Sequence, residues 1–188
     1  TRLVKVDGAS KVATFEKTTD SGTETIERKF DMLHVVPPQA PPDVVRDSKL
    51  ADAAGWVSVD PATLRHTAYA NVFALGDCAG TSNAKPAAAV RKQAPVVACN
   101  VAATLDHRAI GAEYDGYGAC PLTVERGRIV LAEFAYNGAL TPTFPKWLLD
   151  GQKPPWLAWF LKEKIMPLLY WDFMLRGREI MVKPKMKA

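Results

Sequence analysis

The chain has 188 residues, enough for one substantial domain or for one domain and part of a second. Hydrophobic residues make up 48% of it and the formal net charge is +4, so the composition excludes a disordered protein. The three cysteines, Cys78, Cys99 and Cys120, form no CxxC pair. Their odd number argues against a self-contained disulfide framework, and no metal site is expected.

The first thirty residues are predicted to form a small antiparallel sheet. Residues 3–6 and 12–16 are predicted to be two strands joined by a turn, as in a β-hairpin, and residues 25–29 supply a further strand. The chain begins within this strand pattern and lacks an initiator methionine, so we expect it to be a piece of a longer protein.

Two further strands are expected before the middle of the chain. Residues 31–36 form an apolar run that ends at two prolines, which predicts a buried strand. The prolines between residues 37 and 42 predict an extended connector. Residues 56–60 alternate between apolar and polar side chains, as a half-exposed strand does.

The segment 71–78 is the most informative part of the sequence. Residues 72–75 are apolar on both faces, as in a parallel strand covered by helices, and open α/β sheets bind ligands beyond such strand ends. Gly76 would allow a ligand to approach the backbone closely, since it has no Cβ. Asp77 would then accept hydrogen bonds from a ribityl or ribose chain, which indicates a flavin dinucleotide such as FAD.

A helix is expected from about residue 86 to residue 105, with Pro86 as its first residue and a kink at Pro95. Its first turn would present the free N–H groups of residues 87–89 at the positive end of the helix dipole, where an anionic group is stabilised. Lys85 would add positive charge. An ordinary turn followed by an alanine-rich core helix is an equally open interpretation.

Cys120 follows two glycines at the head of an expected strand. Residues 122–124 and 128–136 predict a hairpin across a short turn. Free cysteine is often simply buried, so from the residues alone Cys120 is better explained by a structural role than by a redox role. We expect Cys78 and Cys99 to be small core residues beside the loop and within the helix.

Residues 141–188 are basic and aromatic, with nine Lys and Arg against four Asp and Glu, and with four of the five tryptophans. The apolar runs 154–161 and 165–171 are too short to span a bilayer. Short helices lying in the headgroup layer are expected: membrane contact is favoured for residues 156–164, whereas residues 170–175 could equally pack against another domain. The lysines form no basic stripe, which argues against nucleic-acid binding. The candidate membrane contacts are Trp156, Trp159, Tyr170, Trp171 and Phe173.

Seven ordered blocks of the sequence resemble sulfide:quinone oxidoreductase, and most closely the branch that includes the mitochondrial enzyme. The resemblance begins near residue 31 and covers most of the chain. The blocks are residues 31–38, 53–57, 71–78, 86–90, 114–122, 129–134 and 168–177.

The resemblance implies an α/β fold, namely part of the two-dinucleotide-binding-domain flavoprotein fold, which is FAD/NAD(P)-binding and Rossmann-like, followed by C-terminal membrane-docking helices. Residues 1–30 would be a remnant of the pyridine-nucleotide-like domain. Residues 31–110 would be the C-terminal part of the FAD-binding domain. Residues 111–188 would combine the redox-cysteine hairpin with an amphipathic quinone-docking region.

In that family, sulfide is oxidised through a cysteine persulfide and FAD, and two electrons pass to a quinone. Cys120 matches the distal cysteine of the redox pair in its Cys-Pro-Leu setting. The partner cysteine and the first FAD-binding half belong to the N-terminal part of the family pattern, so we expect this chain to be inactive alone. The expected FAD contacts are Gly76, Asp77, Lys85, Ala87, Ala88, Ala89 and Val90.

The resemblance also implies partners and a location. Sulfide, a quinone, a sulfane-sulfur acceptor and a membrane surface are expected partners, and a homo-oligomer is possible for such an enzyme. The protein would be peripheral to a bacterial or a mitochondrial inner membrane. The alternatives are another quinone-reducing flavoprotein, such as a type II NADH dehydrogenase, and a non-catalytic membrane-binding module.

Overall fold

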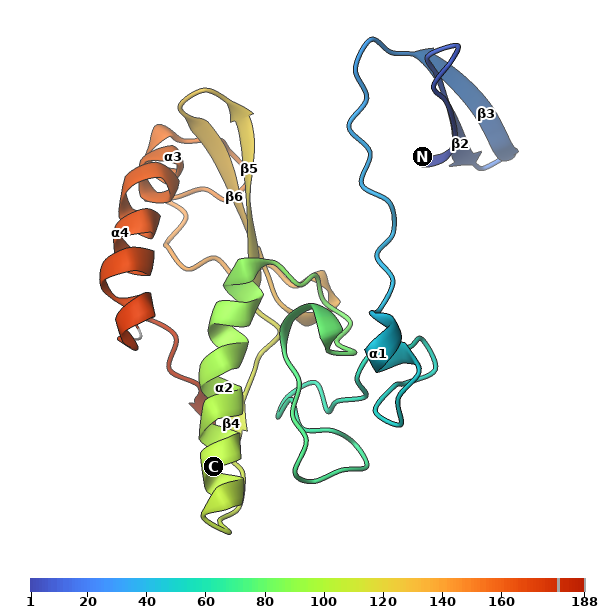
Figure 1. Ribbon diagram of the computed structural model, residues 1–188. Helices are drawn as coiled ribbons and strands as arrows, with labels where there is room; N and C mark the ends of the chain where they lie inside the picture. Colours follow the sequence, from blue (N-terminus) through green and yellow to red (C-terminus); the bar gives the residue numbers. More distant parts are fainter. Residues whose placement is uncertain (179, 188) are drawn as a thin grey trace. The chain divides into compact units, whose positions relative to one another are not determined.

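The computed structural model describes residues 1–178 and 180–187 (Figure 1). The chain divides into two compact units, Thr1–Gln39 and the remainder from Ala40 onward. The described part is a small mixed α/β structure with three separate short sheets.

The first unit is a three-stranded antiparallel sheet in the order β1-β2-β3, which confirms the sheet expected for the first thirty residues. In the central strand, Phe15 pairs with Leu3 on one side and with Ile26 on the other. Ala13 is the one residue of this unit that is fully enclosed among those described. The strands are β1 (Arg2–Asp7), β2 (Val12–Thr19) and β3 (Gly22–Lys29).

Residues 31–36 do not form the buried strand that was expected. They pair with no strand in the described chain, and Met32 and Val36 are 88% and 74% exposed. An apolar run becomes a strand only where neighbouring strands pair its backbone groups and other elements cover its faces. No described residue does either here, so the prediction for this segment was wrong.

The second unit begins with irregular chain that is joined by isolated bridges between single residues. Val57 bridges to Ala51 and Ala79, and Val59 bridges to His66. The alternation expected for residues 56–60 is therefore present as burial of Val57 and Val59, without a continuous strand. Residues 72–75 are also not a strand, because Phe73 makes a single bridge to Arg65 and no parallel neighbour is present in the described chain.

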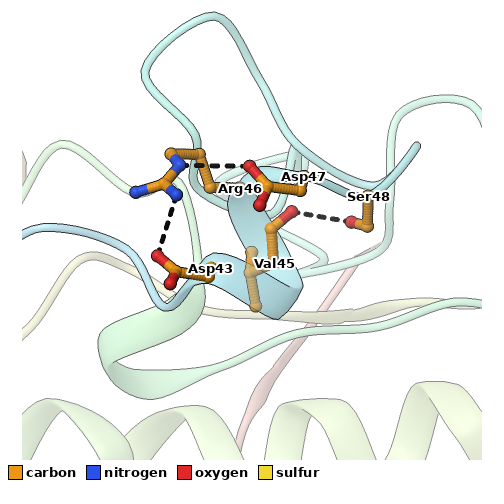
Figure 2. Close-up of polar contacts among 5 residues, drawn as sticks. All are labelled: Asp43, Val45, Arg46, Asp47 and Ser48. Carbon is orange, nitrogen blue, oxygen red and sulfur yellow. Dashed lines mark hydrogen bonds and ion pairs between the residues drawn. The ribbon is translucent and has the colours of Figure 1, made fainter.

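The short helix α1 (Asp43–Arg46) starts this unit and is fixed at both ends by polar contacts (Figure 2). The Arg46 guanidinium lies 2.8 Å from the Asp43 carboxylate and 3.1 Å from that of Asp47. The Ser48 hydroxyl donates to the Val45 carbonyl at 2.7 Å. The helix has no side-chain cap at Pro42, so these local contacts are the polar side-chain interactions that hold it.

Helix α2 (Ala87–Leu105) organises the second unit, as expected for residues 86–105, and it continues through Pro95. Its buried positions recur every three or four residues, which places them on one face of the helix. Leu64, Ala112 and Tyr114 pack against this face. The buried positions of the helix are Ala89, Gln93, Val96, Asn100 and Ala103.

A two-stranded hairpin of β5 (Gly118–Glu125) and β6 (Arg128–Phe134) rises beside the N-terminal end of α2 (Figure 1), which confirms the expected hairpin. A second pair, β4 (Ala112–Glu113) with β7 (Lys185–Met186), brings the C-terminal segment back to the region after α2. Two 3-10 turns, Gly76–Cys78 and Tyr136–Gly138, complete this part.

The tail forms consecutive helical segments. Pro167 is the second residue after the π-helical turn, and because proline has no N–H it cannot continue the regular hydrogen-bond ladder. Ala158 packs with Ile129 and Leu149, which attaches the tail to the hairpin. No helix in residues 1–178 or 180–187 is long and apolar enough to cross a membrane. The segments are α3 (Trp156–Phe160), the π-helix Leu161–Ile165, α4 (Met166–Asp172) and a 3-10 turn Met174–Arg176.

Candidate flavin and cysteine site

Gly76 occupies a position that only glycine fits without strain. Its φ is +69°, and its N–H donates to the buried Gln93 Oε1 at 2.8 Å. A Cβ at this position would lie 3.3 Å from Cγ2 of Val90. The turn therefore rests directly on the first turns of α2, which explains the glycine by backbone conformation and close packing.

The N-terminus of α2 carries two free amide groups instead of the expected three. Pro86 is the N-cap residue, just before the helix, and it was expected to be the first helical residue. The Ala89 N–H donates to the Pro86 carbonyl at 2.8 Å, as does that of Val90 at 3.3 Å. The N–H groups of Ala87 and Ala88 have no partner among the described residues, so they are available to an anionic group.

Lys85 lies just before α2 and contacts both the Gly76 turn and Trp56. Its Nζ donates to the backbone carbonyl of Asp77 at 3.1 Å and lies 4.1 Å from the centroid of the Trp56 ring. Burial, the largest influence, lowers the pKa of Lys85, and the attraction of Asp77 partly opposes this. The Asp77 side chain is exposed, and no described residue makes a hydrogen bond or ion pair with it. The carboxylate is therefore free to bind a polyhydroxyl chain.

Buried polar atoms without partners occur in the loop between the Gly76 turn and α2, and on α2 itself at Gln93. Thr81 Oγ1, Asn83 Oδ1 and Gln93 Nε2 are all enclosed, and no described residue satisfies them. Such atoms are costly in a folded protein unless a ligand or water binds them. Together with the free amides of Ala87 and Ala88, they supply donors and acceptors that suit a dinucleotide such as FAD.

The structure brings the Cys120 strand to this helix terminus. A Cβ on Gly118 would lie 3.4 Å from Cγ of Pro86, so β5 begins close to the N-cap of α2. Cys120 is two residues further along β5 and therefore lies on the same face of the strand. Its side chain is partly buried, and it is the third residue of β5, where it pairs with Ala132.

The two other cysteines differ in their surroundings. Cys78 is partly buried, contacts a small core cluster and donates from Sγ to the Leu75 carbonyl at 3.3 Å. Cys99 is exposed, so its expected core position was wrong. It lies next to Asn100 but off the buried stripe of α2, and helical periodicity alone explains the difference.

A buried acidic residue was missed in the sequence. Glu133 is 7% exposed, and its carboxylate accepts hydrogen bonds from the Tyr117 hydroxyl at 2.6 Å and from the Thr143 N–H at 3.0 Å, as well as from the Thr143 hydroxyl. A usable signal was present, because Ile129, Leu131 and Glu133 share one face of β6. A carboxylate continuing a buried apolar face predicts hydrogen-bond partners in the fold.

Burial strongly affects the tyrosines around this site. It raises the pKa of Tyr117 to about 12, with the Glu133 carboxylate as the next contribution. Burial also raises the pKa of Tyr114, whose hydroxyl donates to the Tyr117 carbonyl at 2.6 Å and accepts from the Asn83 side chain at 2.7 Å. It likewise raises the pKa of Tyr136. These phenols therefore stay neutral and act as hydrogen-bond donors at neutral pH.

The aromatic residues of the tail fall into two groups. Trp156 and Trp171 are 59% and 64% exposed, and Tyr170 is exposed as well. Trp159 and Phe173 are half-buried, and Trp159 packs against the cluster around Ile129. The structure thus separates three residues that are free to bind a surface from two that contribute to packing.

Comparison with known proteins supports one family. The chain is 42% identical to the mitochondrial sulfide:quinone oxidoreductase of Dictyostelium discoideum over 94% of its length. It is 40% and 37% identical to the proteins of the same name from Mus musculus and Schizosaccharomyces pombe, over 93% of its length in each case. It covers 38% of each of these relatives. No protein-family model matches the chain.

A solved structure is also similar. One chain of the cryo-EM structure of the Tetrahymena thermophila mitochondrial ATP synthase F1Fo tetramer matches with a TM-score of 0.73 and 27% identity. The match covers 94% of this chain and 42% of that one. The named relatives do not favour a type II NADH dehydrogenase or a non-catalytic module. Over almost its whole length, the chain is thus a relative of the mitochondrial sulfide:quinone oxidoreductases, and it spans about two fifths of their length.

Proposed function

We propose that this chain is the C-terminal part of a sulfide:quinone oxidoreductase, in which it provides the second half of the FAD site, one redox cysteine and a membrane-docking tail. The observation that carries the proposal is the proximity of Gly118 to Pro86. It joins the strand of Cys120 to the helix terminus at which the flavin is expected. The relatives named above support the activity.

In the proposed reaction, Cys120 is one member of a cysteine pair. Hydrosulfide attacks the disulfide of the pair, so that one sulfur becomes a persulfide and the other leaves as a thiolate. The outer sulfur of the persulfide then passes to a sulfane-sulfur acceptor, which leaves both cysteines reduced, and reoxidation of the pair to its disulfide releases two electrons. Cys120 is suited to this role because it is partly buried at the end of an ordered hairpin and belongs to no described disulfide.

FAD, when bound, would accept the two electrons and deliver them to the quinone. The residues of this chain would bind and orient it. The free amides of Ala87 and Ala88 would hold an anionic part of the cofactor, and Asp77 would accept hydrogen bonds from its hydroxyl groups. Lys85 would add a positive charge close to the same place, and Gly76, Ala89 and Val90 would shape the contact surface.

The tail is proposed to dock on the membrane that contains the quinone. Trp156, Tyr170 and Trp171 expose aromatic surface, and Lys162 and Lys164 lie on the π-helical turn between α3 and α4. Aromatic side chains mixed with lysines are typical of helices that lie at the membrane interface. Because the named relatives are mitochondrial proteins, we propose the mitochondrial inner membrane as the location.

The visible spectrum of the intact purified protein tests the proposed function. We expect a flavin absorption band that is bleached by sulfide under anaerobic conditions and restored by a soluble quinone. The same titration with NADH is the control, because a type II NADH dehydrogenase would be bleached by NADH. A flavin that responds to NADH and not to sulfide, or a protein without flavin, would overturn the proposal.

A further inference from the structure

We propose that Glu133 is a positioning residue that holds the Cys120 strand against the N-terminus of α2 through Tyr117 and Thr143; the role given to Cys120 rests on the proposed function. We refer to Glu133, Tyr117 and Thr143 as the carboxylate clamp. The Glu133 carboxylate is buried, and no described basic side chain forms an ion pair with it. Its partners are instead three neutral donors, all from the other two clamp residues.

The clamp joins three segments that are distant in the sequence. Tyr117 immediately precedes β5, Glu133 lies in β6, and Thr143 lies in the connection to the tail helices. A buried carboxylate stabilises a fold only when its hydrogen bonds are complete, since an unpaired buried charge is very costly. Each segment is therefore held in the position at which the Glu133 carboxylate is satisfied.

Tyr117 fixes one side of the clamp to the core of α2. Its ring packs against the cluster that contains Ala89 and Val96, and Lys92 Nζ lies 5.0 Å from the ring centroid. Its raised pKa, about 12, keeps the hydroxyl protonated, so it donates to Glu133 throughout the neutral range. Tyr117 thus fixes the position of Glu133 relative to α2.

The strand register transmits the same constraint to Cys120. Ala119 pairs with Glu133, and Cys120 pairs with Ala132. Successive residues of a strand point to opposite faces, so Glu133 and Cys120 face opposite sides of the hairpin. Glu133 therefore does not reach the reacting sulfur, and it acts by holding the strand in place.

Gly118 lies close to the Phe134 ring and to Pro86, with little space for a side chain. A Cβ there would lie 2.7 Å from the Phe134 ring and 3.4 Å from Pro86. The hairpin is thus packed against the N-cap of α2 on the Cys120 face and held by the carboxylate clamp on the other face. Loosening the clamp is expected to let the start of β5 move away from Pro86.

The test compares Glu133→Ala and Tyr117→Phe with Glu125→Gln in the intact protein. Glu125 is an exposed carboxylate at the other end of the same hairpin, so its substitution controls for a charge change in the hairpin. Tyr117→Phe removes a single hydroxyl and is the milder change if Glu133→Ala does not fold. Folding of each variant is checked by far-UV circular dichroism.

The first measurement is the rate at which iodoacetamide labels Cys120 in the intact protein with its cysteine pair reduced, divided by the rate for Cys78 and followed by peptide mass spectrometry. Labelling of a partly buried thiol follows local opening, so losing one hydrogen bond to the buried carboxylate should raise this ratio by about tenfold. Glu125→Gln should leave it unchanged. Because both substitutions act on one clamp, Glu133→Ala combined with Tyr117→Phe should label no faster than Glu133→Ala alone.

The second measurement is sulfide-dependent quinone reduction. In folded Tyr117→Phe we expect kcat to fall while KM for the quinone stays constant, since the quinone contacts are unchanged. The proposed role of the carboxylate clamp would be overturned by an unchanged labelling ratio in folded Tyr117→Phe. It would also be overturned if the labelling ratio rose equally in Glu125→Gln. Absence of the activity in the unsubstituted protein would overturn the proposed function, and the labelling ratio would still decide on the clamp.

Discussion

Helix α2 and the tail helices α3 and α4 bury very different kinds of side chain. The buried stripe of α2 contains two amides, Gln93 and Asn100, and three small or medium apolar residues. The tail segments carry large aromatic residues, yet Ala158 is the one buried residue described in α3, and α4 has none. The more hydrophobic helices are thus the less buried ones. Burial depends on the surrounding chain, and an exposed aromatic face indicates a surface that binds a membrane or a partner.

The largest effect is expected from removing a buried amide of α2. Asn100 donates to the carbonyls of Thr63 and Ala112 at 3.0 and 2.9 Å and accepts from the Ala112 N–H at 3.0 Å. Asn100→Ala leaves these buried groups unsatisfied, at ~1–3 kcal/mol each, so we expect a loss of roughly 3 kcal/mol or more in the free energy of unfolding.

Urea unfolding followed by tryptophan fluorescence measures this loss. All five tryptophans lie beyond Gln39, so the signal reports the second unit alone. Asn71→Ala, at an exposed position, is the matched control and should be neutral. If Asn100→Ala were equally neutral, the buried stripe of α2 would not organise this unit.

In the tail, substitutions should weaken membrane binding and leave the stability of the fold nearly unchanged. Replacing Trp156 and Trp171 by Ser should change the urea midpoint little, because both side chains are mostly exposed. Binding to anionic vesicles should weaken strongly, since inserting about 100 Å² of each ring is worth ~2.5 kcal/mol. Met32→Ser, at an exposed apolar residue of the first unit, should leave vesicle binding unchanged. Undiminished co-sedimentation of the double variant would show that these tryptophans do not dock.

Gly76 tests how tightly the candidate site is packed on α2. Gly76→Ala should cost about 1–2 kcal/mol for its positive φ and a further increment for the Val90 contact. Gly177 has the same φ of +69°, and a Cβ there would have no described neighbour within 4 Å, so Gly177→Ala isolates the backbone cost. Adding Val90→Ala to Gly76→Ala should restore the part of the unfolding free energy that is lost through the contact with Val90. Equal losses of unfolding free energy in Gly76→Ala and Gly177→Ala would contradict the close packing of Gly76 on Val90.

A smaller effect is expected from the pH dependence of Tyr117. Its folded pKa is raised to about 12, above the usual 10.0, so the neutral phenol favours the folded state. This stability is complete below about pH 10 and is lost as the pH rises towards about 12. Phenylalanine cannot ionise, so the urea midpoint of Tyr117→Phe should fall less over this interval. A parallel fall in both proteins would contradict the burial of the phenol.

Local sequence patterns predicted the elements that depend on near neighbours. The sheet of the first thirty residues, the helix over 86–105 and the hairpin after Cys120 all appear where alternation, helical periodicity and turn residues indicated them. The strand predictions for residues 31–36 and 72–75 were wrong for the same reason. A strand between parallel neighbours depends on chain that is distant or outside the described residues, and an apolar run does not reveal whether that chain is present.

The candidate site was predictable in part. Gly76 and the start of α2 come together as the sequence indicated, but the Pro86 N-cap and the occupied Ala89 amide depend on local geometry that propensity does not resolve. Glu133 was missed because a carboxylate in a strand usually faces solvent. Its partners Tyr117 and Thr143 are distant from it in the sequence, so no local pattern joins them.

The most direct test of the proposed function is sulfide-dependent quinone reduction by the intact protein with Cys120→Ser. Cys99→Ser is the matched control, because Cys99 is an exposed thiol on α2. We expect Cys120→Ser to retain bound flavin and to lose sulfide-dependent activity, and Cys99→Ser to retain both. Unchanged sulfide-dependent quinone reduction in Cys120→Ser would contradict the assignment of Cys120 as a redox cysteine, and with it the proposed function.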